Sequence, residues 1–341
     1  SRSDPRRRCV LSDPGLHLAA RPSVLKFEYM PTRLVHSATR VLAEGVDRVF
    51  ASTALTPSQR ARVRSSAESL GHDDRIEGLG IIERFYNQVH HEDPDGPFFG
   101  RPAPIAPHIE RVRKFAGKHE VLDLSWPSKF EPLWSVDALT EALSDSMSSQ
   151  VAADLLSAME RARIDRVSTL RDKYLASTHN MTAYARWYRH SDGPRPCVVL
   201  LHGYLGGFYA LEERLWPLRE LFMGGMDVIF TVLPFHGPRR DRRRGFSPPS
   251  FPSSDPRFTI EGMRQLVFDH RGLFDYLRAR GVPDIGVMGA SLGGYSSALL
   301  ATLDPLAFAV FLIPLASIDR FAHEHGRMVG AKEQQRAQAD A

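Results

Sequence analysis

Cysteine is scarce in this sequence, with only Cys9 and Cys197 in a chain of 341 residues. Cys197 stands in an apolar run that predicts a buried strand, and Cys9 stands in a polar stretch, so we expect no disulfide bond between them. The two also lack the close spacing of a structural zinc site. This cysteine usage indicates a reducing compartment, and we expect a cytoplasmic protein.

Long apolar runs are missing as well. The longest, near Ala307–Leu315, falls well short of the roughly 20 residues that a membrane-spanning helix needs. The arginine-rich start has no apolar segment behind it, which argues against a secretory signal. We therefore expect no stable insertion into a membrane.

A large excess of one charge is absent too. The formal net charge is +4, and the basic excess is local, at Arg6–Arg8 and in a loop with Arg239, Arg240 and Arg242–Arg244. Because a nucleic-acid face needs basic residues spread over a surface with aromatic residues between them, we expect no nucleic-acid partner. We interpret the arginine-rich loop as a solvated insertion, and a cap that binds acidic substrate groups is the alternative.

Metal-ligand patterns are sparse. The adjacent His90 and His91 fall in a predicted helix, 73–91. Side chains of neighbouring helical residues point about 100° apart and so rarely bind one ion. We expect no metal and no other cofactor.

What the sequence does contain is a strand, a sharp turn and a helix within Asp284–Leu300. Ser291 stands at the turn, in the centre of the G-x-S-x-G pattern of Gly289–Gly293. A serine on such a turn presents its hydroxyl outward, and the two glycines remove side chains that would clash there. The pattern predicts that Ser291 is a nucleophile. A serine that only caps the helix is the structural alternative.

A second glycine-rich loop follows another apolar strand. The strand is expected at 197–201, the loop runs from His202 to Gly207, and a helix is predicted at about 210–221. The two motifs together resemble the α/β-hydrolase superfamily: His202-Gly203 is similar to the family's H-G after its third strand, and Gly289–Gly293 to its nucleophile elbow. The resemblance covers about 120–319, and the chain looks more like intracellular abhydrolase-domain proteins than like secreted lipases.

The resemblance implies an α/β-hydrolase fold, with a mostly parallel, doubly wound sheet and flanking helices. Strands are predicted at 120–126 and 181–190 on an antiparallel edge, then at 197–201, 227–233, 284–288 and 306–315, with a long helix at 259–280. We expect a disordered tail at 1–29, a helical N-terminal segment at 30–115 and the hydrolase domain at 116–341. The proline-rich stretch 93–107 is expected to link the last two.

The resemblance also implies roles for the site loops. The backbone N–H groups of Tyr204 and Leu292 would form the oxyanion hole, and Gly206 and Gly207 would leave room for an acyl group. His202 is expected to support its loop rather than to act as the base. The remaining loop histidine, His236, is expected to line the pocket or to brace a turn.

One part of the family pattern is missing. The family places its acid and then its histidine base late in the chain, but the stretch after Leu315 is short and polar, with no seventh or eighth strand. Asp319 follows the last predicted strand, where some members carry the acid, and His323 and His325 come soon after it. We therefore expect a fragment whose true acid and base lie beyond Ala341.

These patterns predict a serine hydrolase that cleaves the ester, thioester or amide of a small-molecule acyl substrate through an acyl-enzyme on Ser291. Two alternatives stay open. An acyltransferase would use the same serine and exclude water. A non-catalytic binding protein of the same fold would use Ser291 only as a helix cap.

Overall fold

The fold is given by a computed structural model, which describes residues 80–83, 85–87, 97–134, 167–240, 250–253 and 255–314. The predicted tail, most of the predicted N-terminal helical segment and the pair His90-His91 lie outside these residues. So do Asp319, His323 and His325, together with the arginine cluster Arg242–Arg244.

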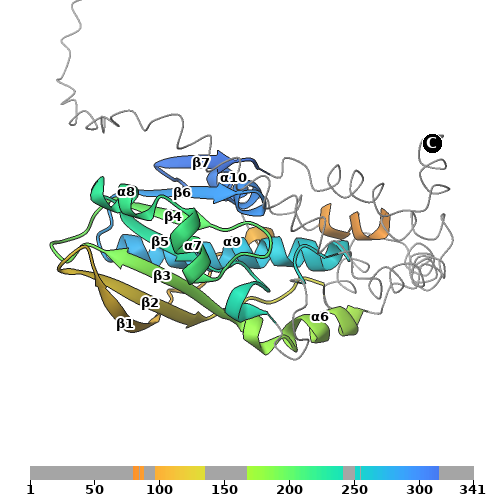
Figure 1. Cartoon of the computed structure of the whole chain (residues 1–341). Coiled ribbons are helices and arrows are strands. Elements are labelled where there is room, and N and C mark those ends of the chain that lie inside the picture. The colour runs from red at the N-terminus through yellow and green to blue at the C-terminus, as the bar shows by residue number, and fades with distance from the viewer. Residues whose placement is uncertain are drawn as a thin grey trace, which may run out of the picture. The chain divides into compact units, whose positions relative to one another are not determined.

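A seven-stranded sheet forms the centre of the described chain, in the order β1-β2-β3-β5-β4-β6-β7 (Figure 1). Strands β1, β2 and β3 are antiparallel, β3 is antiparallel to β5, and β5, β4, β6 and β7 are parallel. This mixed, mostly parallel sheet confirms the predicted fold class, an α/β-hydrolase fold. The strands are β1 His108–Phe115, β2 His119–Pro127, β3 Thr182–Arg189, β4 Cys197–Leu201, β5 Asp227–Thr231, β6 Ile285–Ala290 and β7 Phe308–Leu312.

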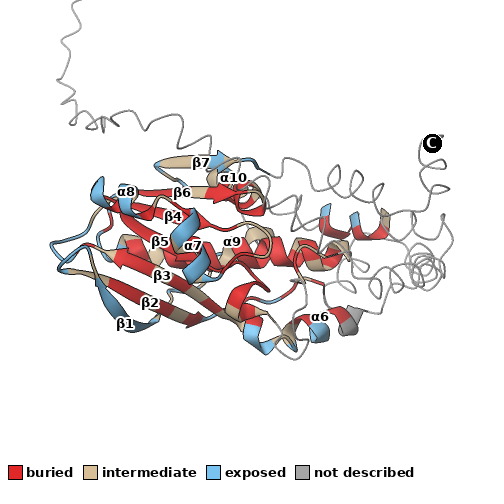
Figure 2. Ribbon diagram, viewed as in Figure 1, coloured by how far each residue is buried: buried red, intermediate tan, exposed pale blue. Residues whose placement is uncertain are grey.

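Helices cover both faces of the sheet, because the central strands are apolar on both sides. In β4, Val199 packs in a core with Leu266 of α9, whereas its neighbour Val198 packs in a second core with Phe222 of α8. Figure 2 shows these central strands buried and β1 exposed. The described α-helices are α6 Val167–Leu175, α7 Tyr209–Leu215, α8 Leu218–Met223, α9 Pro256–Ala279 and α10 Leu292–Leu303.

The sequence did not predict strand β1, which falls inside the segment expected to be helical. Seven of its eight residues are exposed, and pairs of charged residues separate the apolar ones along its H-I-E-R-V-R-K-F sequence. Charges of this kind discourage pairing with another chain at a sheet edge. Arg111 and Arg113 of β1 pair with Glu120 and Glu213 at 3.5 and 3.1 Å.

The helix predicted at 210–221 is two helices. α7 ends with the N–H of Trp216 donating to the carbonyl oxygen of Glu212, and α8 begins after Pro217. Proline has no N–H to donate and restricts the residue before it, which ends α7 at this point.

The stretch predicted as a linker packs against α9 over its described part, 97–107. Arg101 pairs with Asp275 of α9 at 2.7 Å and with Asp304 at 2.9 Å. Arg271 of α9 donates to the carbonyl oxygen of Phe99. We call residues 101–107, which hold Pro102, Pro104 and Pro107, the proline strap.

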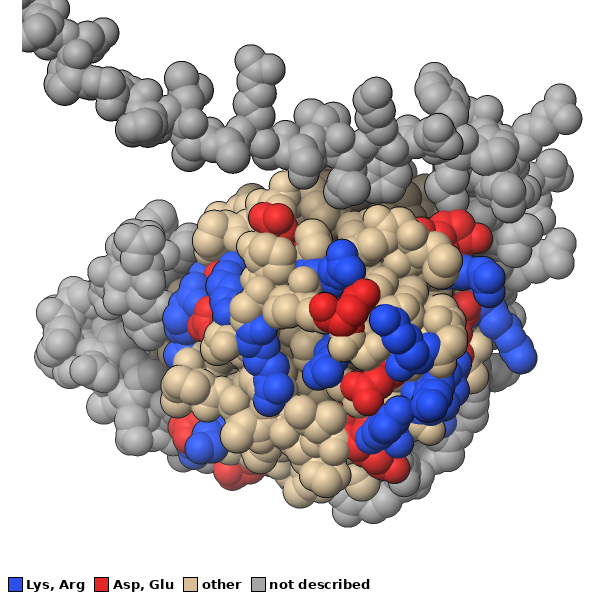
Figure 3. All heavy atoms as spheres, turned by 90° about the vertical axis from the view of Figure 1, so that its left-hand side faces the viewer, with Lys and Arg blue, Asp and Glu red and all other residues tan. Residues whose placement is uncertain are grey.

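Charges of both signs mix on the end of the molecule that Figure 3 shows, with no broad area of one sign. Close ion pairs also join neighbouring strands of the sheet, including Arg186 of β3 with Asp123 of β2 at 2.7 Å. Within the described residues, no helix combines the length and the apolar character that crossing a bilayer requires.

Candidate active site

Ser291 lies where β6 ends and α10 begins, at the carboxyl end of a parallel strand. Its backbone has φ 53° and ψ −116°, which is a sparsely populated region for any residue except glycine. Its side chain makes no capping hydrogen bond to α10. The role of a simple helix cap, which was the structural alternative for this serine, is therefore not observed.

The turn has no room for a side chain at Gly289 or at Gly293. A Cβ at Gly289 would overlap the carbonyl oxygen of Gly293, and a Cβ at Gly293 would overlap the carbonyl oxygen of Leu201. The turn is therefore packed against the end of β4, which runs beside β6 with Leu201 opposite Gly289.

Gly203 brings the second predicted motif to the same place. A Cβ at this position would lie 3.6 Å from the Cβ of Ser291 and 3.5 Å from the carbonyl oxygen of Ala290. The loop after β4 and the turn after β6 are thus neighbours at one edge of the sheet, as expected for the carboxyl ends of parallel strands.

His202 braces its loop through both ring nitrogens. Nδ1 lies 2.7 Å from the carbonyl oxygen of Gly203, and Nε2 accepts a hydrogen bond of 3.0 Å from the N–H of Leu233. Because Nε2 accepts, Nδ1 carries the proton and donates. Burial lowers the pKa of this ring, so it is neutral near pH 7. His202 therefore supports the loop, as predicted, and has no free nitrogen with which to act as a base.

Gly206 and Gly207 leave room for side chains of the protein itself. A Cβ at Gly206 would lie 2.7 Å from Oε1 of Glu212 and 2.8 Å from the Cβ of His202. The same Glu212 oxygen accepts from the N–H of Gly207 at 2.9 Å. Glu212, from α7, and His202 therefore fill the space along the Cβ direction of Gly206, and room for an acyl group beside this loop stays a prediction.

His236 braces the turn after β5. Its Nδ1 lies 2.8 Å from the carbonyl oxygen of Pro234, and the side chain is completely buried. Its Nε2 has no hydrogen-bond partner in the described part of the chain. Burial, together with the nearby His202, holds the pKa of the ring well below its usual value. Tyr204, 5.9 Å away between ring centroids, is half-buried, which raises its pKa to about 12.

The interpretation of the arginine-rich loop as a solvated insertion is wrong for Arg239. Its side chain is 1% exposed and pairs with Asp269 of α9 at 2.8 Å. It also donates to the carbonyl oxygens of Val232 and Asn180. No local sequence pattern indicates this pairing, because the partner lies 30 residues further along the chain.

No described residue makes a hydrogen bond to the hydroxyl of Ser291, so the described part of the chain identifies no base for it. The predicted acid, Asp319, and the candidate bases His323 and His325 fall outside that part. The described residues also contain no cluster of three His, Cys, Asp or Glu side chains that could hold a metal ion.

No family model matches the sequence. Two proteins from two strains of Mycobacterium tuberculosis, both described as uncharacterized, are each 34% identical to this chain over 161 residues. The match spans 45% of this chain and 37% of each relative, so the chain covers little more than a third of their length.

Several solved structures are similar in part. Acetyl xylan esterase from Paenibacillus sp. R4 is 16% identical with a TM-score of 0.40, over 75% of this chain and 63% of that one. Acetyl xylan esterase 1 from Thermoanaerobacterium sp. JW/SL YS485 is 13% identical with a TM-score of 0.40, over 75% and 65%. A putative dienelactone hydrolase from Klebsiella pneumoniae is 19% identical with a TM-score of 0.28, over 39% and 54%.

Proposed function

We propose that this chain is a serine hydrolase that cleaves an ester, thioester or amide through an acyl-enzyme on Ser291. The observation that carries the proposal is the backbone of Ser291, at φ 53° and ψ −116°, combined with a side chain that caps nothing. A conformation of this kind stores about 1–3 kcal/mol and persists only where the surroundings impose it. A turn that served packing alone would place glycine here.

In this proposal the Ser291 Oγ attacks the acyl carbon, the alcohol, thiol or amine departs with a proton, and water later releases the acid and the free serine. The tetrahedral intermediate needs donors for its oxyanion. We assign one to the N–H of Leu292, because the first N–H groups of a helix have no partner within the helix and lie at the positive end of its dipole. The second is assigned to the N–H of Tyr204. Losing one such donor typically raises the barrier by about 3 kcal/mol.

The proposal needs a general base, and His202 cannot supply it because both its nitrogens are engaged with the backbone. We place the base and its acid partner outside the described residues. Within this chain the candidates are Asp319 for the acid and His323 or His325 for the base, in the order that the family uses.

The experiment is the release of p-nitrophenol from p-nitrophenyl acetate under rapid mixing. We expect a burst equal to the concentration of enzyme, followed by slower turnover, because the acyl-enzyme forms before it is hydrolysed. The Ser291→Ala variant should show no burst. The control Ser191→Ala, which changes an exposed turn serine, should match the wild type. A burst that survives in folded Ser291→Ala would contradict the proposal.

A further inference from the structure

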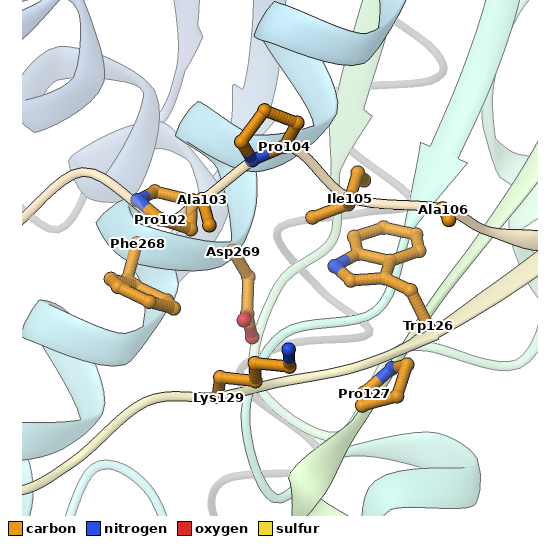
Figure 4. Close-up of a pocket in the computed structure, with 10 residues that line it drawn as sticks. All are labelled: Pro102, Ala103, Pro104, Ile105, Ala106, Trp126, Pro127, Lys129, Phe268 and Asp269. Carbon is orange, nitrogen blue, oxygen red and sulfur yellow. The ribbon is translucent and has the colours of Figure 1, made fainter.

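A cavity that Ser291 does not line lies between the proline strap and α9 (Figure 4). Its volume is about 240 Å³. The strap forms one wall, and Phe268 and Asp269 of α9 form another. The remaining lining comes from Trp126 and Pro127 at the end of β2 and from Lys129 two residues beyond it. None of the motifs that define the Ser291 site contributes to this lining.

The strap wall is held rigidly. Proline has a restricted φ and no N–H, so Pro102 and Pro104 stiffen the strap and leave few backbone donors facing the cavity. Arg101 fixes one end through its pairs with Asp275 and Asp304. At Gly272 the strap comes so close to α9 that a Cβ there would lie 3.0 Å from Cγ2 of Ile105. The cavity is therefore preformed.

Two hydrogen-bond donors point into this space. Figure 4 shows the indole nitrogen of Trp126 and the ammonium group of Lys129 turned toward the gap between the strap and α9. The Trp126 side chain is 4% exposed. Within the described residues, neither donor has a hydrogen-bond or ion-pair partner. An indole N–H usually finds an acceptor when it leaves water, so that of Trp126 is available to a ligand that fills the cavity.

The charge balance of the cavity is positive. The one acidic group in the lining, Asp269, already accepts a hydrogen bond of 2.6 Å from the hydroxyl of Ser128 and pairs with Arg239 at 2.8 Å. The charge of Arg239 offsets that of Asp269, and Lys129 adds a positive charge at an exposed position of the lining. A ligand with one negative charge would pair with Lys129.

The walls and the volume fit an aromatic ring. A dry apolar cavity of about 150 Å³ is large enough for benzene, and this one has room for a ring together with a small polar group. Trp126 and Phe268 offer the aromatic surfaces on which rings pack well. The prolines and Ile105 complete an apolar lining.

We propose that this cavity binds a small aromatic carboxylate. Its ring lies between the strap and α9, and its carboxylate accepts hydrogen bonds from Lys129 Nζ and Trp126 Nε1. The proposal does not depend on catalysis at Ser291.

The test follows the indole N–H signals of the ¹⁵N-labelled protein while 3-phenylpropanoate is added. The chain has four tryptophans, and a Trp126→Phe variant identifies the signal of Trp126. We expect that signal to move and saturate with a dissociation constant near or below 1 mM, about what a ligand of this size reaches. The same titration of Ser291→Ala should give an unchanged constant, which separates this site from the proposed catalysis.

Matched variants test the role of the charge. Lys129→Gln should weaken binding about tenfold or more, because a charge-assisted hydrogen bond is lost. Lys129→Arg should retain most of it. The control Lys114→Gln removes the same charge from β1, near the turn into β2, and should bind like the wild type.

Three results would overturn the proposal. One is no saturable change in the Trp126 signal in a protein whose other signals show that it is folded. Another is equal binding by Lys129→Gln and the wild type. The third is equal binding of inorganic phosphate or of the neutral 3-phenylpropanol, which would mean that the cavity does not select an aromatic carboxylate.

Discussion

The Nη2 of Arg239 lies 2.8 Å from Oδ2 of Asp269, and both side chains are almost completely buried. Arg239 belongs to the turn after β5 that also carries His236, whereas Asp269 is in the middle of α9. The other oxygen of Asp269 accepts from Ser128, just after β2. One buried pair therefore connects the loop beside the candidate active site to the helix that lines the cavity beside the proline strap.

Removing Arg239 should destabilise the protein strongly. In Arg239→Met the charge of Asp269 stays buried without its partner, so we expect the free energy of unfolding to fall by about 3–5 kcal/mol. Urea denaturation followed by circular dichroism measures this. The control Arg219→Ala, at an exposed position of α8, should change it by no more than about 0.5 kcal/mol. Equal effects of the two variants would mean that the buried pair adds nothing.

Alanine substitutions at Gly203 and Gly293 should have different effects, the first on activity and the second on stability. A methyl group at Gly203 would make ordinary contacts, 3.6 Å from the Cβ of Ser291, but would stand beside the nucleophile. Gly203→Ala should therefore unfold within about 1 kcal/mol of the wild type and lose most of its esterase burst. Gly293→Ala should lose stability severely, because its methyl overlaps the end of β4. A fully active Gly203→Ala would show that Gly203 does not face the reacting group.

Ser291 has a strained backbone conformation, so a substitution that relieves the strain should stabilise the fold. Glycine adopts positive φ readily, so Ser291→Gly should be more stable than Ser291→Ala by about 1 kcal/mol. The neighbouring Ala290 is the control, because it lies in regular strand β6, where replacement by glycine should be destabilising by a similar amount. Thermal unfolding of the three variants compares them. A Ser291→Gly protein less stable than Ser291→Ala would contradict the strained turn.

His270 should make stability depend on pH. Burial lowers the pKa of this ring in the fold from 6.5 to about 4. Between these values the unfolded chain binds a proton that the folded chain does not, so stability is lost as pH falls from about 6.5 toward 4. The contribution is about 1.4 kcal/mol per pH unit. In His270→Gln the slope of unfolding free energy against pH should be smaller by that amount, and an unchanged slope would assign the effect to other groups.

The sheet was largely predictable from the sequence, because its central strands are short apolar runs with turns between them. Cys197–Leu201 was predicted to the residue, since all five of its residues are buried. Strand β1 was not predicted, because its residues are charged and exposed and do not form the apolar pattern of a core strand. Its place is set by pairing with β2, a long-range contact that no local pattern carries.

The site was predictable only where local sequence imposes the geometry. The turn at Ser291 follows from the two glycines that its packing requires. Arg239 was misread because its partner is distant in sequence and a run of arginines usually indicates a solvated loop. The cavity beside the strap could not be foreseen, since it joins residues near 104, 126 and 268 that have no pattern in common.

The most direct test of the central claim is covalent labelling of Ser291 with a fluorophosphonate probe, read as intact mass and then located by peptide sequencing. The account predicts one adduct per folded chain, on Ser291, that is absent from Ser291→Ala and unchanged in Ser191→Ala. An adduct on another residue, or no adduct on a protein that unfolds cooperatively, would contradict it and would favour a binding role for this fold.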